Sequence, residues 1–351
     1  MTVFMLLGAL DRILGGRLGL GQEFENGILT FGSLALSMLG IICLAPVLAR
    51  FLRPVVVPVF TLFGADPGMF PGSILACDMG GAALALEMAE DSAAGLFGGV
   101  LIGSMLGATI VFTIPVALGV IKEQDRQFLA KGVLAGIITI PVGGLAGGLT
   151  AGFPLGMLVR NMIPIVLFAL LIVLGLWKAE NLMIKGFVIF GKVVTAVITV
   201  GLAAAIVEEL TGFVVISGLA PLADGYITVG SIAIILAGAF PLIYLITKVF
   251  QKPLMKLGGL LGMNDVAAAG MVASLANSIP MFGMLRDMDD RGKVLNMAFS
   301  VSAAFVFGDH LGFTAGFAPQ MILPVIVGKL AAGISAVAVA MLLMKNNRQR
   351  A

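Results

Sequence analysis

The chain has 351 residues, of which 60% are hydrophobic and only 11% are charged, whereas about a quarter of the residues in a soluble domain are charged. The mean hydropathy of +1.12 therefore predicts a polytopic membrane protein. The 21 Lys and Arg nearly balance the 19 Asp and Glu, and the net charge of +2 argues against a nucleic-acid partner or a basic peripheral protein.

The apolar segments divide into one short run and eight long ones. Residues 1–10 are too few to cross about 30 Å of hydrocarbon, so this run predicts a truncated first span or an interfacial stub. Each of the other runs is long enough to cross as one helix. The eight predicted spans are 28–49, 94–121, 128–150, 161–177, 186–207, 226–247, 294–312 and 320–344.

Two further apolar regions, 54–90 and 252–290, carry Pro, Gly, Asp and Asn in their interiors. The first contains GADPGMFPG followed by ACDMGG, and the second contains GMND followed by ANSIP. Irregular backbone at membrane depth is tolerated only where it lines a cavity or is buried in protein. We therefore expect each region to be a re-entrant or broken-helix hairpin.

An internal repeat relates the two halves of the chain. A shift of 198 residues aligns GILTFGSLALSMLG, which starts at Gly27, with GYITVGSIAIILAG, which starts at Gly225, and six of the fourteen positions are identical. The repeat predicts three parts: a first repeat over 1–160, a linker span and loop over 161–185, and a second repeat over 186–351.

The basic residues predict that the repeats are inverted. If both interrupted regions are hairpins, five spans separate the span at 28 from its copy at 226, and an odd number inverts the copy. Sixteen of the 21 Lys and Arg then share one side with the carboxy terminus, only Arg50, Arg53 and Arg160 lie on the other, and Lys192 and Lys329 lie inside spans. The positive-inside rule makes the side with sixteen cytoplasmic. Inverted repeats with paired broken helices are typical of secondary transporters.

Asp78 is the first candidate for substrate binding. Ionisable groups at membrane depth cost about 2.5 to 3.5 kcal/mol on insertion scales, so the few that occur are candidates for function. Asp78 lies between Cys77 and two glycines in the middle of the first hairpin. It could hold a small cation or an ammonium group, or it could instead cap the second arm of the hairpin.

Asn277 is the counterpart of Asp78 after a one-residue shift of the repeat. A carboxylate and a neutral amide that meet between two hairpins suit a substrate with one charged end and one hydrogen-bonding end. Asn277 could equally cap the helical arm that contains Pro280. The neighbouring Cys77 and Ser278 complete the predicted contacts of the two hairpins.

Asp309 and His310 stand where the first repeat has Ala108 and Thr109. They could form a second cation site or a proton relay, or they could be an intramembrane pair that satisfies itself. The sequence shows no Walker A loop, metal-ligand cluster or nucleophile-base pair. It therefore predicts no enzyme activity, no metal and no cofactor.

Four motifs resemble the EutH family of ethanolamine utilisation permeases: ACDMGGAALALEM, AAAGMVASLANSIPMFGM, DRGKVLNMAFSVSAAF and GDHLGF. The resemblance covers nearly the whole chain. It implies uptake of ethanolamine across the bacterial inner membrane. Ethanolamine is mostly protonated at neutral pH, so its ammonium and hydroxyl fit the carboxylate of Asp78 and the amide of Asn277. Two other classes remain open from the residues themselves: a channel, and a membrane sensor or scaffold that does not transport. Neither the oligomeric state nor a coupling ion follows from the sequence.

Overall fold

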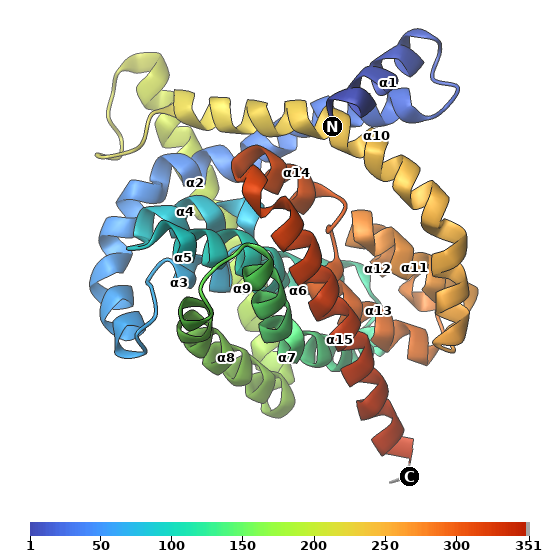
Figure 1. Ribbon diagram of the computed structural model, residues 1–351. Coiled ribbons are helices and arrows are strands. Elements are labelled where there is room, and N and C mark those ends of the chain that lie inside the picture. The colour runs from blue at the N-terminus through green and yellow to red at the C-terminus, as the bar shows by residue number, and fades with distance from the viewer. Residues whose placement is uncertain (349–351) are drawn as a thin grey trace.

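The structure is a computed structural model that describes the backbone of residues 1–348, with their side chains except those of residues 180, 247, 250–252, 254, 257 and 346–348. Within this range every regular element is a helix, which confirms the all-α prediction, and the termini lie at opposite ends in Figure 1. The α-helices are α1 (Thr2–Ile13), α2 (Leu20–Leu62), α3 (Met69–Ile74), α4 (Gly81–Met88), α5 (Ser92–Leu96), α6 (Ile114–Val120), α7 (Arg126–Thr150), α8 (Leu155–Lys178), α9 (Glu180–Thr211), α10 (Leu222–Leu260), α11 (Asp265–Ala276), α12 (Ser278–Met284), α13 (Asp290–Ala303), α14 (Asp309–Phe317) and α15 (Ile322–Arg348). The 3₁₀-helices are η1 (Cys77–Met79), η4 (Glu123–Asp125), η5 (Leu285–Asp287) and η6 (Pro319–Met321), and the π-helices are η2 (Phe97–Gly107) and η3 (Thr109–Thr113).

Seven helices in the described part of the chain are long and apolar enough to cross a membrane, so the protein is a multi-pass membrane protein. They correspond to seven of the eight predicted spans. The prediction of a continuous span over 294–312 is wrong, because α13 ends at Ala303 and α14 begins only at Asp309. Between them, the backbone N–H groups of Phe305 and Phe307 donate to the carbonyl oxygens of Ser274 and Leu275. These hydrogen bonds replace the ones that a continuous helix would make.

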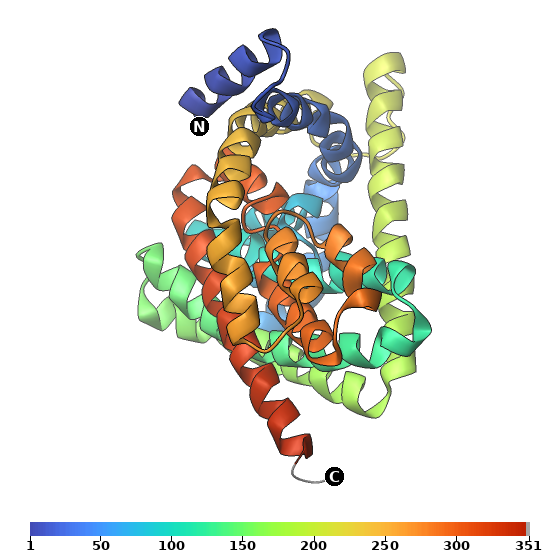
Figure 2. The same cartoon turned by 90° about the vertical axis from the view of Figure 1, so that its right-hand side faces the viewer.

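The two longest helices, α2 and α10, pack against each other across the top of the molecule and then run down its two sides (Figure 1). Their contact is close because a Cβ atom at Gly27 would overlap the backbone of Ala237. Helix α2 continues through Pro46, Pro54 and Pro58, and α10 also contains prolines in its interior. Helix α9 lies along one edge of the molecule in Figure 2 and contacts α2.

Both hairpins are shorter than predicted. Because α2 extends to Leu62, the prediction that the first hairpin begins at residue 54 is wrong, and its arms are α3 and α4, joined by η1. The second hairpin consists of α11 and α12, since α10 extends to Leu260 and not only to the predicted residue 247. The backbone at the hairpin tips is extended at Ala76 and at Asn277.

The base of each hairpin is closed by a side-chain carboxylate that binds backbone N–H groups. In the first hairpin, Asp66 accepts hydrogen bonds from the N–H groups of Gly68, Glu90 and Asp91. In the second hairpin, Asp289 accepts one from the N–H of Asn264, at 2.9 Å. These hydrogen bonds join the two ends of each hairpin, as is typical of Asp side chains at turns.

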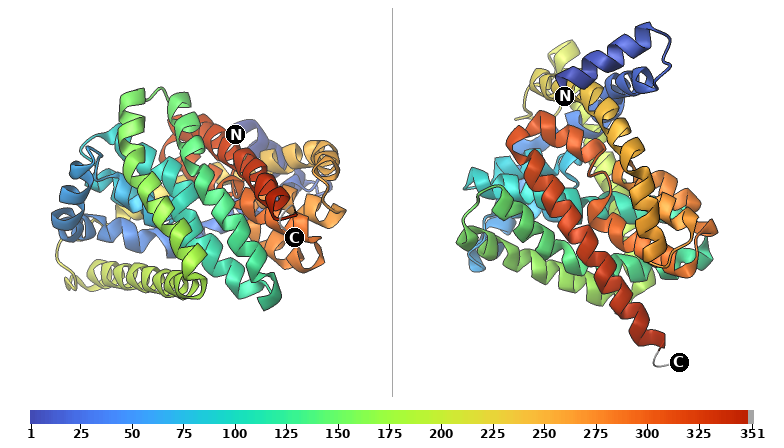
Figure 3. Two further views of the ribbon diagram at one scale, coloured as in Figure 1. Left: turned by 90° about the horizontal axis from the view of Figure 1, so that it is seen from below. Right: turned by 45° about the vertical axis from the view of Figure 1, so that its right-hand side comes forward.

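The two halves of the chain share one interior. Helix α15 crosses the molecule diagonally in the right-hand view of Figure 3 and packs against α7. The hydroxyl of Thr139 on α7 donates to the carbonyl oxygen of Ala332 on α15, at 3.0 Å. Thr109 donates in the same way to Val301, and a buried ion pair of 2.8 Å joins Lys293 to Asp125. Neither half can therefore move without disturbing polar contacts to the other.

Glycine lets the first hairpin approach the π-helical segment η2. A Cβ atom at Gly72 would overlap the carbonyl oxygen of Gly98, and both residues are buried. Backbone can shift less readily than a flexible side chain, so the contact requires glycine at residue 72. The π-helix of η2 lies directly beside the hairpin, as is frequent for π-helical turns near functional sites.

We predict that Gly72→Ala lowers the free energy of unfolding by about 1 to 3 kcal/mol, because the new methyl group overpacks this contact. The matched control is Gly186→Ala on α9, where no atom lies within 4 Å of the added Cβ position. The control should be neutral or more stable by up to about 1 kcal/mol, since alanine is the better helix former. Thermal unfolding in detergent measures both variants, and equal unfolding temperatures would contradict the prediction.

Candidate functional site

A cavity of about 920 Å³ lies between the two hairpin tips, the break that separates α13 from α14, and the facing sides of α2 and α10. Its volume falls in the range of small-molecule sites. Four of the six predicted site residues line it, namely Asp78, Asn277, Asp309 and His310. The other two, Cys77 and Ser278, are fully buried beside Asp78 and Asn277. The geometry thus brings the two hairpins and the Asp309–His310 segment together.

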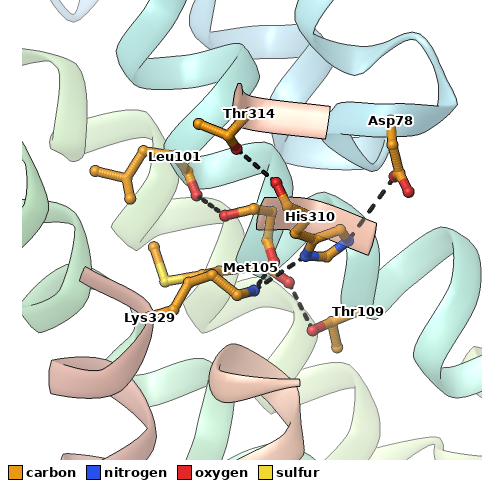
Figure 4. A network of polar contacts seen from close by, with 8 residues as sticks. Asp78, Leu101, Met105, Thr109, His310, Thr314 and Lys329 are labelled. Atoms are coloured by element: carbon orange, nitrogen blue, oxygen red, sulfur yellow. Dashed lines mark hydrogen bonds and ion pairs between the residues drawn. The ribbon is translucent and has the colours of Figure 1, made fainter. Parts of the chain in front are cut away.

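The Asp78 carboxylate at the tip of the first hairpin is partly exposed and lines the cavity. Its side chain is 19% exposed, and one oxygen lies 3.8 Å from Nε2 of His310 (Figure 4). Helix α4 begins after Gly80 without a side-chain cap, so Asp78 does not serve as the cap that the sequence left open. A carboxylate that is neither capping a helix nor held at hydrogen-bonding distance can accept a ligand.

Asn277 caps a helix with its side-chain oxygen, and its amide N–H groups remain available as donors. Its Oδ1 accepts a hydrogen bond from the N–H of Ile279 at 2.9 Å, which caps α12. Among the described residues, Nδ2 of Asn277 has no hydrogen-bond acceptor. The two interpretations of this residue are therefore compatible, because the oxygen serves the helix while the amide hydrogens can serve a ligand.

Lys329 is a further candidate site residue that the sequence analysis did not select. It lies on α15 and is 1% exposed, and its Nζ contacts both the carbonyl oxygen of Ser104, at 2.5 Å, and Nδ1 of His310, at 3.1 Å. Figure 4 shows the resulting row from Lys329 through His310 to Asp78. The sequence could have indicated this residue, because burying a lysine inside a membrane span costs free energy and marks it as a candidate for function.

A polar stripe on α2 was also missed. Glu23, Asn26, Thr30, Ser33 and Ser37 all line the cavity. Their spacing of three and four residues places them on one face of the helix. The same periodicity read from the sequence predicts a wet face on an otherwise apolar span, and it extends the cavity along α2.

Aromatic side chains complete the wall. Phe305 has a φ of 62°, a left-handed conformation that no other non-glycine residue in the described range adopts. Its ring centroid lies 5.1 Å from that of His310 and 5.5 Å from that of Phe112. Strained backbone persists where the surroundings enforce it, and it is concentrated at functional sites. The ring faces of Phe305 and Phe112 can also attract an ammonium group.

Ligand atoms of Cys77, Asp78 and His310 lie within 4.8 Å of one another. A metal ion could in principle use such a set. Lys329, however, already occupies Nδ1 of His310, and a buried ammonium at this distance repels a divalent cation. We therefore assign no metal to this cluster.

The helices define a multi-pass membrane protein with a cavity between the tips of its two hairpins. The sequence profile described as "Ethanolamine utilisation protein, EutH" matches residues 1–343, and the chain belongs to this family. The family resemblance of the four sequence motifs is thereby confirmed. No solved structure matches the chain.

Three relatives are similar over nearly their whole length. The "Probable ethanolamine permease EutH" of Listeria monocytogenes serotype 1/2a (strain 10403S) is 61% identical, over 100% of this chain and 95% of that protein. A protein with the same name in Escherichia coli (strain K12) is 50% identical, over 98% and 94%. The "Uncharacterized protein YxeR" of Bacillus subtilis (strain 168) is 52% identical, over 97% and 92%.

We predict that the polar stripe of α2 is wetted in the membrane. A cysteine introduced by Ser33→Cys should react with a hydrophilic thiosulfonate reagent, because residue 33 lines the cavity. The matched control is Leu36→Cys, one turn along α2, where the 70% exposed side chain lies outside the cavity and should face lipid. The native cysteines are buried and should stay unlabelled. Equal labelling rates at residues 33 and 36 in membranes would refute a wet face.

Proposed function

We propose that this chain binds protonated ethanolamine in the cavity and carries it into the bacterial cell across the cytoplasmic membrane. The observation that carries the proposal is the pairing, inside one membrane-protein cavity, of acidic groups at Asp78 and Asp309 with free amide donors at Asn277. The substrate named for the relatives has the complementary ends, an ammonium and a hydroxyl. These relatives are named permeases, which supports transport and not catalysis.

Each end of the substrate has a partner of matching chemistry. The ammonium donates hydrogen bonds to the Asp78 carboxylate, and the rings of Phe305 and Phe112 lie nearby. The hydroxyl oxygen accepts a hydrogen bond from Nδ2 of Asn277. Buried charges must be paired, so the cavity selects a cation over a neutral molecule of the same size.

We also propose that residues 1–160 and 186–351 are inverted repeats joined by a linker over 161–185. The distribution of Lys and Arg supports this topology and makes the carboxy terminus cytoplasmic. Each repeat contributes one hairpin, α3–η1–α4 or α11–α12, to the cavity. Relative movement of hairpins and the long helices α2 and α10 then exposes the site alternately to the two sides.

We predict that Asp78→Asn abolishes saturable ethanolamine counterflow in proteoliposomes. The substitution keeps the volume and removes the charge, and loss of one partner from a desolvated charge pair costs about 2 to 5 kcal/mol, or roughly thirtyfold or more in affinity. The matched control is Glu87→Gln on the same hairpin, which is exposed and lies outside the cavity. It should transport like the parent protein. Undiminished counterflow by Asp78→Asn at equal protein levels would overturn the assignment.

Asn277 requires two variants, because its side chain also caps α12. Asn277→Ser retains a capping oxygen but lacks amide donors, and Asn277→Ala loses both. Both variants should bind ethanolamine more weakly by about 1 to 3 kcal/mol and discriminate it less from ethylamine, which lacks the hydroxyl. Only Asn277→Ala should lose about 1 kcal/mol of stability in addition. Unchanged discrimination in the stable serine variant would show that Asn277 does not bind the hydroxyl.

A further inference from the structure

Lys329 is an amine in the interior of the protein without an anionic partner in contact. Among the described residues, no carboxylate lies within 4.0 Å of its Nζ. Its two polar partners, the carbonyl oxygen of Ser104 and Nδ1 of His310, are both neutral acceptors. An ammonium held in this way depends on more distant negative charge, because an isolated buried ion is strongly disfavoured.

The negative charge that Lys329 can use lies across His310. With Lys329 protonated and donating to Nδ1, the imidazole carries its hydrogen on Nε2, which points at the Asp78 carboxylate 3.8 Å away. The other titratable groups that face this row are the buried thiol of Cys77 and the carboxylate of Asp309. Asp78 is therefore the cavity carboxylate whose negative charge stabilises the Lys329 ammonium through the imidazole.

The lysine side chain ends in a primary alkylammonium, and so does ethanolamine. Both cations require the charge of Asp78, one directly in the cavity and the other through the imidazole. Once the substrate ammonium pairs with Asp78, Lys329 loses its counter-charge and gains a like charge nearby. Like charges disfavour the protonated form, so the two ammonium groups compete.

We propose that Lys329 exchanges a proton for the substrate, so that each ethanolammonium ion that binds releases one proton. This inference rests on the proposed function of the cavity. In the step, an N–H bond of Lys329 breaks and its electron pair stays on Nζ, while the proton passes to Nδ1 of His310. At the same time, Nε2 of His310 gives its proton to a water molecule in the cavity. The products are a neutral lysine, a neutral imidazole of the opposite tautomer and a hydronium ion, so atoms and charge balance.

The exchange determines what the transporter moves. The empty site returns with Lys329 protonated, so one cation enters for each proton that leaves. No net charge crosses the membrane, and the result equals entry of the uncharged amine. Uptake then responds to the pH difference and to consumption of ethanolamine inside the cell, but not to the membrane potential.

The decisive experiment counts the protons released on binding. Purified full-length protein is titrated with ethanolamine by calorimetry at pH 7 in phosphate and in Tris, whose different ionisation enthalpies report the protons released. We expect about one proton per ethanolamine in the parent protein, and an affinity that rises about tenfold per pH unit while Lys329 titrates. Saturable binding that releases no proton would contradict the exchange and leave the proposed function standing. Absence of saturable binding by the parent would contradict both.

Three variants assign the proton to Lys329. Lys329→Met should bind ethanolamine with little proton release and little dependence on pH. Lys329→Arg stays charged, so it should release no proton and bind more weakly than Lys329→Met. The matched control is Lys192→Met, which removes an exposed lysine from the spanning helix α9 and should release protons like the parent. Full proton release by either Lys329 variant would overturn the assignment, and the arginine variant keeps the test available if the methionine variant does not fold.

Uptake into proteoliposomes tests whether transport depends on the pH difference and not on the membrane potential. Uptake of labelled ethanolamine by the parent protein should be accelerated by an acidic interior and unchanged by a potassium diffusion potential, negative inside, set with valinomycin. Acceleration by the potential at equal pH on both sides would mean that the charged form crosses alone, and it would contradict the exchange.

Discussion

The hydrogen bonds from Phe305 and Phe307 to the carbonyl oxygens of Ser274 and Leu275 are the interaction on which the site depends. Within a bilayer, a helix can be interrupted only where other groups satisfy its backbone. The second hairpin supplies these groups, so the break between α13 and α14 and the hairpin tip at Asn277 are parts of one structure. The break in turn brings Asp309 and His310 to the cavity wall.

The spans could be predicted from hydrophobicity, but the points at which helices break or end could not. Seven spans follow from the length of apolar runs. The run at 294–312 is less apolar, because it contains Asn296, Asp309 and His310. The hydrogen bonds that hold its break are made to residues about thirty positions earlier. Conversely, the prolines of α2 mark a plausible end that the helix does not take. Contacts with the first hairpin support α2 beyond Pro46, since Arg53 donates to the carbonyl oxygen of Glu87 and the ring of Phe60 packs edge-on against that of Phe70. Sequence patterns report local preference, whereas the break after α13 and the continuation of α2 past its prolines depend on tertiary contacts.

The candidate site was predictable to the extent that the repeat relates its parts. Asp78 and Asn277 occupy corresponding positions, and the structure brings both to one cavity. The contact of Lys329 with Ser104 joins residues 225 positions apart, and no periodicity in either helix indicates it. The polar stripe of α2 is a different omission, because its spacing is visible in the sequence. The mean hydropathy of the helix is high because the apolar residues outnumber the polar ones, so it does not reveal a polar face of this width.

The closed hairpin bases affect how the chain can be assembled during synthesis. Asp66 binds the N–H groups of residues 24 and 25 positions later, and Asp289 binds one 25 positions earlier. Loops of this length close at a modest entropic cost. Neither closure uses a residue from the other half of the chain. Each hairpin can therefore close with residues of its own half of the chain, before the other half is in place.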